Sequence, residues 1–251
     1  MRLHRFLAVA GAALALAVRA QASPTVTLVA TSTASIDPLS ITPILAANPD
    51  GSFSASGSGG LPGSLSLVYS LQLRGDPTLS GSFTLTNLSS KTQFFSVTAT
   101  MAVAAVPAPT KMGGFYGDVT YTDTGSSTGS TPDSTVTIAT NGTDPFYRAQ
   151  IDGVTVQSRG AFNLTAFGGP GAFGVISQDA WGTPIPSLAG PGVASSIGVS
   201  FPAFSLTPGD AVSVPFEFVV NAPEPSFASL FASGLTLILL ATARRKFFQG
   251  A

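Results

Sequence analysis

Apolar and polar side chains alternate with a period of two along several stretches of this chain. In "GSLSLVYSLQLRG" (Gly63–Gly75) every second residue from Leu65 to Leu73 is apolar, and the same alternation recurs in "QFFSVTATMAV" (Gln93–Val103). "VSVPFEFVV" (Val212–Val220) repeats the pattern near the C-terminus. Such alternation is typical of a strand that buries one face and exposes the other to water.

Turn signals separate these runs. Asp152-Gly153 lies between two short alternating runs, which is a strong hairpin signal. Leu88–Lys91 and Pro208-Gly209 also interrupt alternating segments, and no sustained 3.6-residue apolar period occurs between residues 23 and 221. The pattern predicts an all-β fold, an antiparallel β-sandwich that is immunoglobulin-like in general layout.

Two stretches lack a clear period. Thr31–Gly63 is rich in Ser, Gly and Pro, and we expect a loop there with weak strand candidates only near Ile41–Leu45. Thr122–Ser134 is a polar excursion that we expect to be a mobile loop.

The N-terminus has the layout of a secretory signal peptide. Two arginines precede an uncharged apolar segment, Phe6–Val18, and small residues follow at Ala20 and Ala22. Thirteen apolar residues are fewer than the roughly 20 needed to span a bilayer, which disfavours a membrane anchor. We therefore expect signal peptidase to remove residues 1–22 and leave Ser23 as the first mature residue.

A second uncharged apolar segment, Phe227–Ala243, is 17 residues long and could form a transmembrane helix. Its large apolar side chains surround the whole helix, which argues against an amphipathic helix that packs on the body. The basic cluster Arg244, Arg245 and Lys246 follows at once and is expected to remain cytoplasmic, which places the body across the membrane.

Pro223, Glu224 and Pro225 stand directly before this apolar segment. Together, the three parts in residues 222–251 resemble the PEP-CTERM sorting domain of Gram-negative bacteria. The resemblance implies recognition by an exosortase-type membrane protease, an inner-membrane-anchored precursor, and release to the cell surface or an exopolysaccharide matrix. Stretches of the body (residues 23–221) also look like those of uncharacterised proteins that bear this tail.

Composition narrows the partners of the body. Residues 23–221 carry five basic and eleven acidic side chains, a net charge of −6, so nucleic acid is not expected as a partner. Ser and Thr fill much of the remaining surface. Asn87, Asn141 and Asn163 head Asn-X-Ser/Thr triplets, to which the sequence assigns no function.

The chain lacks the residues that most catalytic and metal sites need. It has no cysteine, and its only histidine, His4, lies in the expected signal peptide. A Ser-His-Asp triad, a zinc-histidine site and a thiol nucleophile are therefore excluded from the body, and no cofactor is expected. Asp118, Asp123 and Asp133 offer oxygens to a calcium ion, but their spacing matches no known calcium loop, and solvated loop aspartates are the alternative.

Three functions remain open. The first is a non-catalytic cell-surface or matrix protein, which the absence of reactive residues favours. The second is a carbohydrate-binding module in which Trp181 stacks on a sugar, with Tyr116, Tyr121 and Tyr147 as further rings; the alternative for Trp181 is an indole packed at one end of the sandwich. The third is a carboxylate-dependent glycosidase, which needs two acids roughly 5–10 Å apart in a cleft.

Overall fold

The computed structural model describes residues 24–123, 135–139, 145–160, 163–167 and 173–222. Every regular element in these ranges is a β-strand, and the pairs between strands are antiparallel. The prediction of an all-β fold with antiparallel sheets is therefore confirmed. No helix long and apolar enough to cross a bilayer occurs within these ranges.

The strands form two large sheets and a small one. The six-stranded sheet has the order β12 (Val154–Arg159), β11 (Tyr147–Ile151), β17 (Ser196–Leu206), β7 (Gln93–Ala102), β1 (Thr25–Ser32) and β2 (Leu39–Ile41). The ten-stranded sheet has the main order β14 (Phe173–Ile176), β9 (Val119–Thr122), β18 (Ala211–Asn221), β6 (Thr78–Asn87), β5 (Leu65–Arg74), β4 (Phe53–Leu61) and β3 (Ala46–Ala47). In the same sheet β8 (Thr110–Tyr116) pairs with β18, β15 (Asp179–Trp181) and β16 (Leu188–Gly190), while β10 (Thr135–Ala139) and β13 (Asn163–Phe167) form a separate pair.

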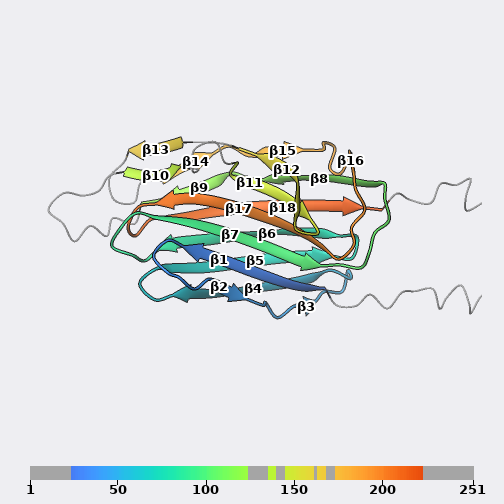
Figure 1. Ribbon diagram of the computed structural model, residues 1–251, viewed down its shortest axis with the longest axis horizontal. Coiled ribbons are helices and arrows are strands. Elements are labelled where there is room, and N and C mark those ends of the chain that lie inside the picture. The colour runs from blue at the N-terminus through green and yellow to red at the C-terminus, as the bar shows by residue number, and fades with distance from the viewer. Residues whose placement is uncertain (1–23, 124–134, 140–144, 161–162, 168–172, 223–251) are drawn as a thin grey trace, which may run out of the picture.

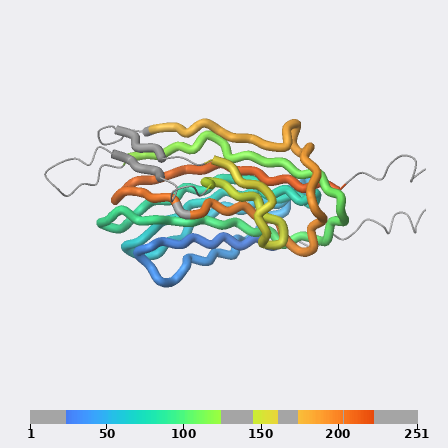
Figure 2. Tube along the Cα trace, turned by 45° about the horizontal axis from the view of Figure 1, so that its top comes forward, coloured from blue at the N-terminus to red at the C-terminus, as the bar shows by residue number. Residues whose placement is uncertain are grey.

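The long strands of both large sheets run along the long axis of the molecule (Figure 1). Figure 2 shows the first strands, in blue, at one edge and the segment that carries β14 to β16, in orange, at the opposite edge. The described chain begins and ends at the same end of the molecule, the right-hand end in Figure 1.

The core lies between the two large sheets and is rich in phenylalanine. Phe83 of β6 meets Phe201 of β17 edge to face, with ring centroids 5.1 Å apart. Phe201 also packs 5.8 Å from Phe216 of β18. Aromatic pairs of this kind add roughly 0.5–1.5 kcal/mol each beyond the area that they bury. The contacts join the two sheets face to face.

The alternating runs behave as predicted. In β5 the side chains of Leu65, Leu67, Tyr69, Leu71 and Leu73 are buried, and those between them are partly or fully exposed. The register of the sheet follows from this pattern, because a slip by one residue would turn every apolar side chain outward.

The predicted turns are also present. Asp152 and Gly153 join β11 to β12 and both have positive φ, 51° and 78°, which is the geometry that matches the twist of a tight hairpin. Leu88–Lys91 connects β6 to β7, and Pro208-Gly209 connects β17 to β18. Both connections cross from one large sheet to the other.

The expectation that Thr31–Gly63 is mainly a loop is wrong. This stretch contains β2, β3 and the nine-residue strand β4. β4 pairs with β5 along its whole length, from Phe53 opposite Leu73 to Leu61 opposite Leu65. Serine and glycine have low strand propensity, and the alternation is hidden because β4 buries few apolar side chains. Pairing with the strongly alternating strand β5 decides the structure here.

Candidate functional site

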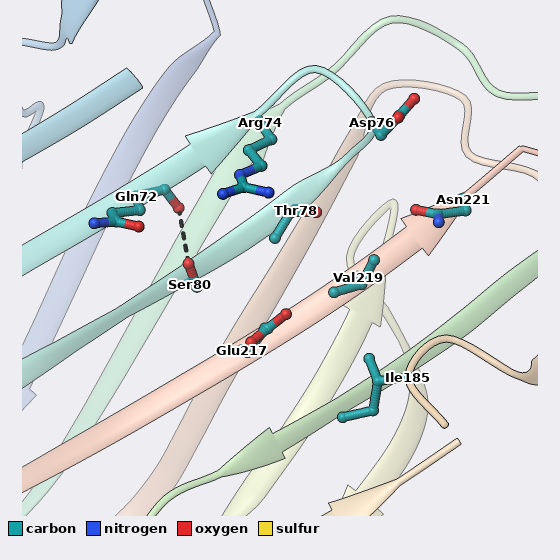
Figure 3. Close-up of a pocket in the computed structure, with 9 residues that line it drawn as sticks. All are labelled: Gln72, Arg74, Asp76, Thr78, Ser80, Ile185, Glu217, Val219 and Asn221. Carbon is teal, nitrogen blue, oxygen red and sulfur yellow. Dashed lines mark hydrogen bonds between the residues drawn. The ribbon is translucent and has the colours of Figure 1, made fainter. Parts of the chain in front are cut away.

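A polar hollow of about 410 Å³ lies on the ten-stranded sheet. It is formed where β5 ends, β6 begins and β18 ends, and the loop between β15 and β16 adds one side (Figure 3). Its lining residues are Gln72, Arg74, Asp76, Thr78, Ser80, Ile185, Glu217, Val219 and Asn221. We call this set the sheet hollow.

The alternation of the strands produces the polar lining. Gln72 of β5 lies opposite Ser80 of β6, which in turn lies opposite Glu217 of β18. The neighbours of Gln72 and Glu217 along their strands are buried, and so is Leu79 beside Ser80, so these three side chains face outward. The Ser80 hydroxyl donates a hydrogen bond of 3.3 Å to the backbone carbonyl of Gln72 (Figure 3).

Ile185 supplies an apolar side to the sheet hollow. Its loop lies directly on β8 because Gly113 has no side chain there: a Cβ at position 113 would lie 3.1 Å from Ile185 Cγ2 and 3.0 Å from the Gly182 carbonyl oxygen. Val219, which is 7% exposed, is the other apolar residue of the lining. The sheet hollow therefore combines polar groups with a small apolar surface.

The charged groups of the sheet hollow leave a net charge of −1, from Arg74 against Asp76 and Glu217. Within the described part of the chain, Arg74 forms no ion pair with either acid. Asp76 and Arg74 are exposed, whereas Glu217 is partly buried. Asn221 contributes a buried side-chain oxygen, Oδ1, that has no hydrogen-bond donor among the described residues.

Of the two interpretations of Trp181, the exposed ring that stacks on a sugar is wrong, and the structure shows a packed indole. Its side chain is 2% exposed and packs on Phe218, with ring centroids 5.8 Å apart. Tyr116, Tyr121 and Tyr147 are also buried, at 3%, 7% and 0% exposure. The alternation of β18 turns Phe218 towards the core, and the Trp181 ring packs against it there.

The buried tyrosines are held in a dry environment. Burial raises the pKa of Tyr116 to about 12, with a smaller contribution from the negative charge of Asp179. Burial also raises the pKa of Tyr147 far above its usual range, and its hydroxyl donates a hydrogen bond of 3.1 Å to the Glu217 carbonyl. The indole N–H of Trp181 lies near enough to that hydroxyl to oppose the shift slightly, but makes no hydrogen bond of normal geometry. These rings are core residues.

Of the three aspartates considered as calcium ligands, the structure describes Asp118 and Asp123. Asp118 accepts a hydrogen bond of 3.0 Å from the backbone N–H of Gln178, and Asp123 is buried at 3% exposure. Asp133 lies outside the described residues. Among the residues that are described, no group of three or more Asp, Glu, His or Cys side chains is arranged to hold a metal ion.

The residues proposed for export and sorting lie outside the described ranges. These are Ala20, Ala22 and Ser23 at the N-terminus, and Pro223, Glu224, Pro225, Arg244, Arg245 and Lys246 at the C-terminus. The description ends at Ala222, one residue beyond Asn221 of the sheet hollow. The segment that resembles a sorting domain, residues 222–251, therefore follows Asn221 directly in the sequence.

The sheet hollow could not be predicted from the sequence. Alternation places Glu217 on the outer face of its strand, whereas Asp76 precedes a proline, which is typical of a turn. A signal existed in the polar residues that end the alternating run of β5, namely Gln72 and Arg74. The register between β5, β6 and β18 was needed to bring them together with Glu217.

Fold and site define an all-β protein with an open, mixed-charge hollow on one sheet. No protein-family model matches the chain, and no curated protein matches it either.

Proposed function

We propose that this is an exported, non-catalytic protein of the cell surface or exopolysaccharide matrix. The observation that carries the proposal is the order of three signals in residues 222–251: Pro223-Glu224-Pro225, an apolar segment and a basic cluster. The N-terminal signal peptide and the hydroxyl-rich body support it. An immunoglobulin-like general layout of the body is part of this proposal, supported by the two facing antiparallel sheets.

In this proposal the basic cluster holds the apolar helix in the inner membrane with the body on the far side. An exosortase-type protease then recognises the motif around Glu224 and removes the tail. Both prolines fix φ near −65° and keep the chain extended ahead of the helix, so that the glutamate is presented to the enzyme.

The experiment compares Glu224→Gln with wild type in the native host, by a fractionation blot with an antibody against the body. The expected result is that wild type is shortened and released, whereas Glu224→Gln and Pro225→Ala stay full-length in the membrane. Replacing Arg244, Arg245 and Lys246 with Ser should instead misorient the helix or let it slip through.

A control substitution upstream of the motif, Ser213→Ala, should leave processing unchanged. If wild type itself stays full-length and membrane-bound while an exosortase is present, the sorting proposal is wrong. The tail would then be a permanent anchor.

A carbohydrate-binding module is the second candidate, and the sheet hollow is the observation that favours it. In such a module the sheet hollow would hold a sugar by hydrogen bonds, and the sugar would not stack on Trp181.

A carboxylate-dependent glycosidase ranks third. Asp76 and Glu217 line the same hollow, which is the arrangement that such an enzyme needs in outline. However, Asp76 is exposed, whereas the general acid of a glycosidase works in a dehydrated pocket.

A further inference from the structure

We propose that the sheet hollow binds a sugar unit of a neutral polysaccharide. Its volume of about 410 Å³ falls within the roughly 300–1,000 Å³ of small-ligand sites. The ligand class follows from three properties of the lining: the type of its polar groups, its apolar surface and its charge.

Five of the polar side chains end in planar groups that can form paired hydrogen bonds: Gln72, Arg74, Asp76, Glu217 and Asn221. Adjacent hydroxyls on a sugar ring form pairs of donors and acceptors that match such groups. Amides and a guanidinium donate to the sugar oxygens, while the Glu217 carboxylate accepts from sugar hydroxyls, and hydrogen bonds to a charged group are the stronger ones.

Asn221 gives independent support. Its Oδ1 is buried and has no hydrogen-bond donor among the described residues, and a buried polar atom without a partner carries a free-energy cost. If the Asn221 amide turns towards the sheet hollow, which it lines, a ligand hydroxyl can donate to this oxygen and remove that cost. A ligand that offers only acceptors, such as a fully ionised phosphate, would not.

Ile185 and Val219 provide the apolar part of the lining. The C–H edges of a sugar ring can pack against these aliphatic side chains while its hydroxyls reach the strand residues. In Figure 3 Ile185 lies on the opposite side of β18 from Gln72 and Arg74, so a bound ring would lie across β18 between the two.

The charge of the site selects among glycans. With Arg74 opposed by two carboxylates, the site has a net charge of −1, and residues 23–221 carry −6. Like charges repel, so uronic-acid and sulfated polymers are disfavoured. A neutral polymer carries no such penalty.

The surroundings of the sheet hollow suit a long chain. Rows of outward hydroxyls lead away from it across the sheet, with Ser54 opposite Gln72 in one row and Ser56, Ser70 and Ser82 in the next. Successive rows lie about 7 Å apart, since alternate residues of a strand share a face. A polymer can therefore make several weak contacts at once, which raises its retention above that of one sugar unit.

The test is native affinity electrophoresis of the full chain in detergent, through gels that contain one polymer each. The neutral polymers are a soluble β-glucan and a galactomannan; alginate serves as the anionic polymer and chitosan as the cationic one. We expect a neutral polymer to retard wild type. Gln72→Ala with Glu217→Gln should weaken retardation roughly tenfold or more, because one hydrogen bond is lost and a charge-assisted one becomes neutral.

Matched controls are Gln150→Ala on the six-stranded sheet and Asp37→Asn in the loop between β1 and β2, and neither should change retardation. Thermal unfolding of each variant verifies the fold, and Asp76→Asn, in an exposed turn, provides a further variant that leaves the core untouched. The proposal is overturned if no neutral polymer retards wild type, if hollow and control variants behave alike, or if alginate or chitosan binds more strongly.

The biological setting of this site, an extracellular glycan, rests on the proposed function, but the measurement does not. Failure to bind would leave the processing of the tail as measured by fractionation unaffected. If the tail is not processed in the native host, the binding of a neutral polymer by the purified chain is unaffected.

Discussion

Individual polar side chains stabilise the turns that join the two sheets. Asn87, at the end of β6, is completely buried. Its amide nitrogen donates to the carbonyls of Lys91, Leu206 and Thr207, at 2.9, 2.9 and 3.1 Å. Its oxygen accepts from the backbone and hydroxyl of Ser89. The triplet headed by Asn87 therefore has a structural role, and this nitrogen is inaccessible to glycosylation in the folded chain.

We expect Asn87→Ala to lower the free energy of unfolding by about 3 kcal/mol, because it removes a fully buried side chain that makes five hydrogen bonds. Urea denaturation monitored by circular dichroism measures this change. Gln150→Ala, which removes an amide from a partly exposed position, should change stability by less than about 0.5 kcal/mol. A similar loss in both variants would contradict the role given to Asn87.

Asp152 fastens the hairpin of β11 and β12 to the segment before β17. Its carboxylate accepts hydrogen bonds from the backbone N–H groups of Ala194, Ser195 and Ser196, at 2.8, 2.8 and 2.9 Å. These bonds, with that from Ala194 the largest, lower the pKa of Asp152 from 3.8 to about 2.

Because the pKa of Asp152 is lower in the folded chain, its stabilisation is complete above about pH 4 and is lost as the pH falls towards 2. Solvent screening at this exposed site limits the effect to about 1 kcal/mol. Asp152→Asn should be less stable than wild type by that amount at pH 7, and the difference should vanish near pH 2. Urea denaturation at both pH values tests this, with Asp37→Asn as control. A stability difference between the two proteins that persists at low pH would mean that the negative charge of Asp152 does not cause it.

Among the strands, β6 shows what close pairing requires. Gly81 lies in the middle of β6, opposite Leu71 of β5 and Phe216 of β18. A Cβ at this position would lie 2.2 Å from the backbone oxygen of Ser70 and 3.0 Å from the Leu71 Cα. Backbone atoms of a central strand cannot move aside as a flexible side chain can, so the close approach of β5 and β6 depends on glycine here.

We therefore expect Gly81→Ala to lower the free energy of unfolding by about 3 kcal/mol or more, as over-packing in a dense interior does. Thermal denaturation measures the loss. Ser82→Ala, one residue further along β6 and facing outward, serves as the control and should be nearly neutral. An equal melting temperature for Gly81→Ala and wild type would contradict this prediction, because β5 and β6 would then accommodate a methyl group without loss of stability.

At the scale of the whole molecule, the apolar faces of the two large sheets cover each other without any cysteine. The core includes 37 buried residues drawn from both sheets. Burial on this scale is enough to stabilise a domain, since each large apolar side chain contributes about 1.5–3 kcal/mol before chain entropy is subtracted.

We expect residues 23–221, expressed alone, to fold as a predominantly β domain without a metal ion or a disulfide. Far-ultraviolet circular dichroism should show a strand spectrum that is unchanged by a chelator or a reducing agent. A helical or random-coil spectrum, or a requirement for Ca²⁺, would contradict this prediction.

Features that depend on local order could be predicted directly from the amino-acid sequence. The alternation in β5, β7 and β18 fixed their faces, Asp152-Gly153 fixed a hairpin, and the absence of cysteine and of a second histidine limited the chemistry of the body. The proposed signals at both ends depend on local order too, because proteases read them as linear segments.

Features that depend on contacts between distant segments became visible when the chain was seen folded. The tertiary structure made a strand of the Ser/Gly-rich β4, buried Trp181 against Phe218, and turned Asn87 into a link between two turns. The sheet hollow belongs to this group, since Arg74 and Glu217 lie more than 140 residues apart in the chain. The physical reason is that the register between strands sets which outward side chains become neighbours, and alternation alone does not specify that register.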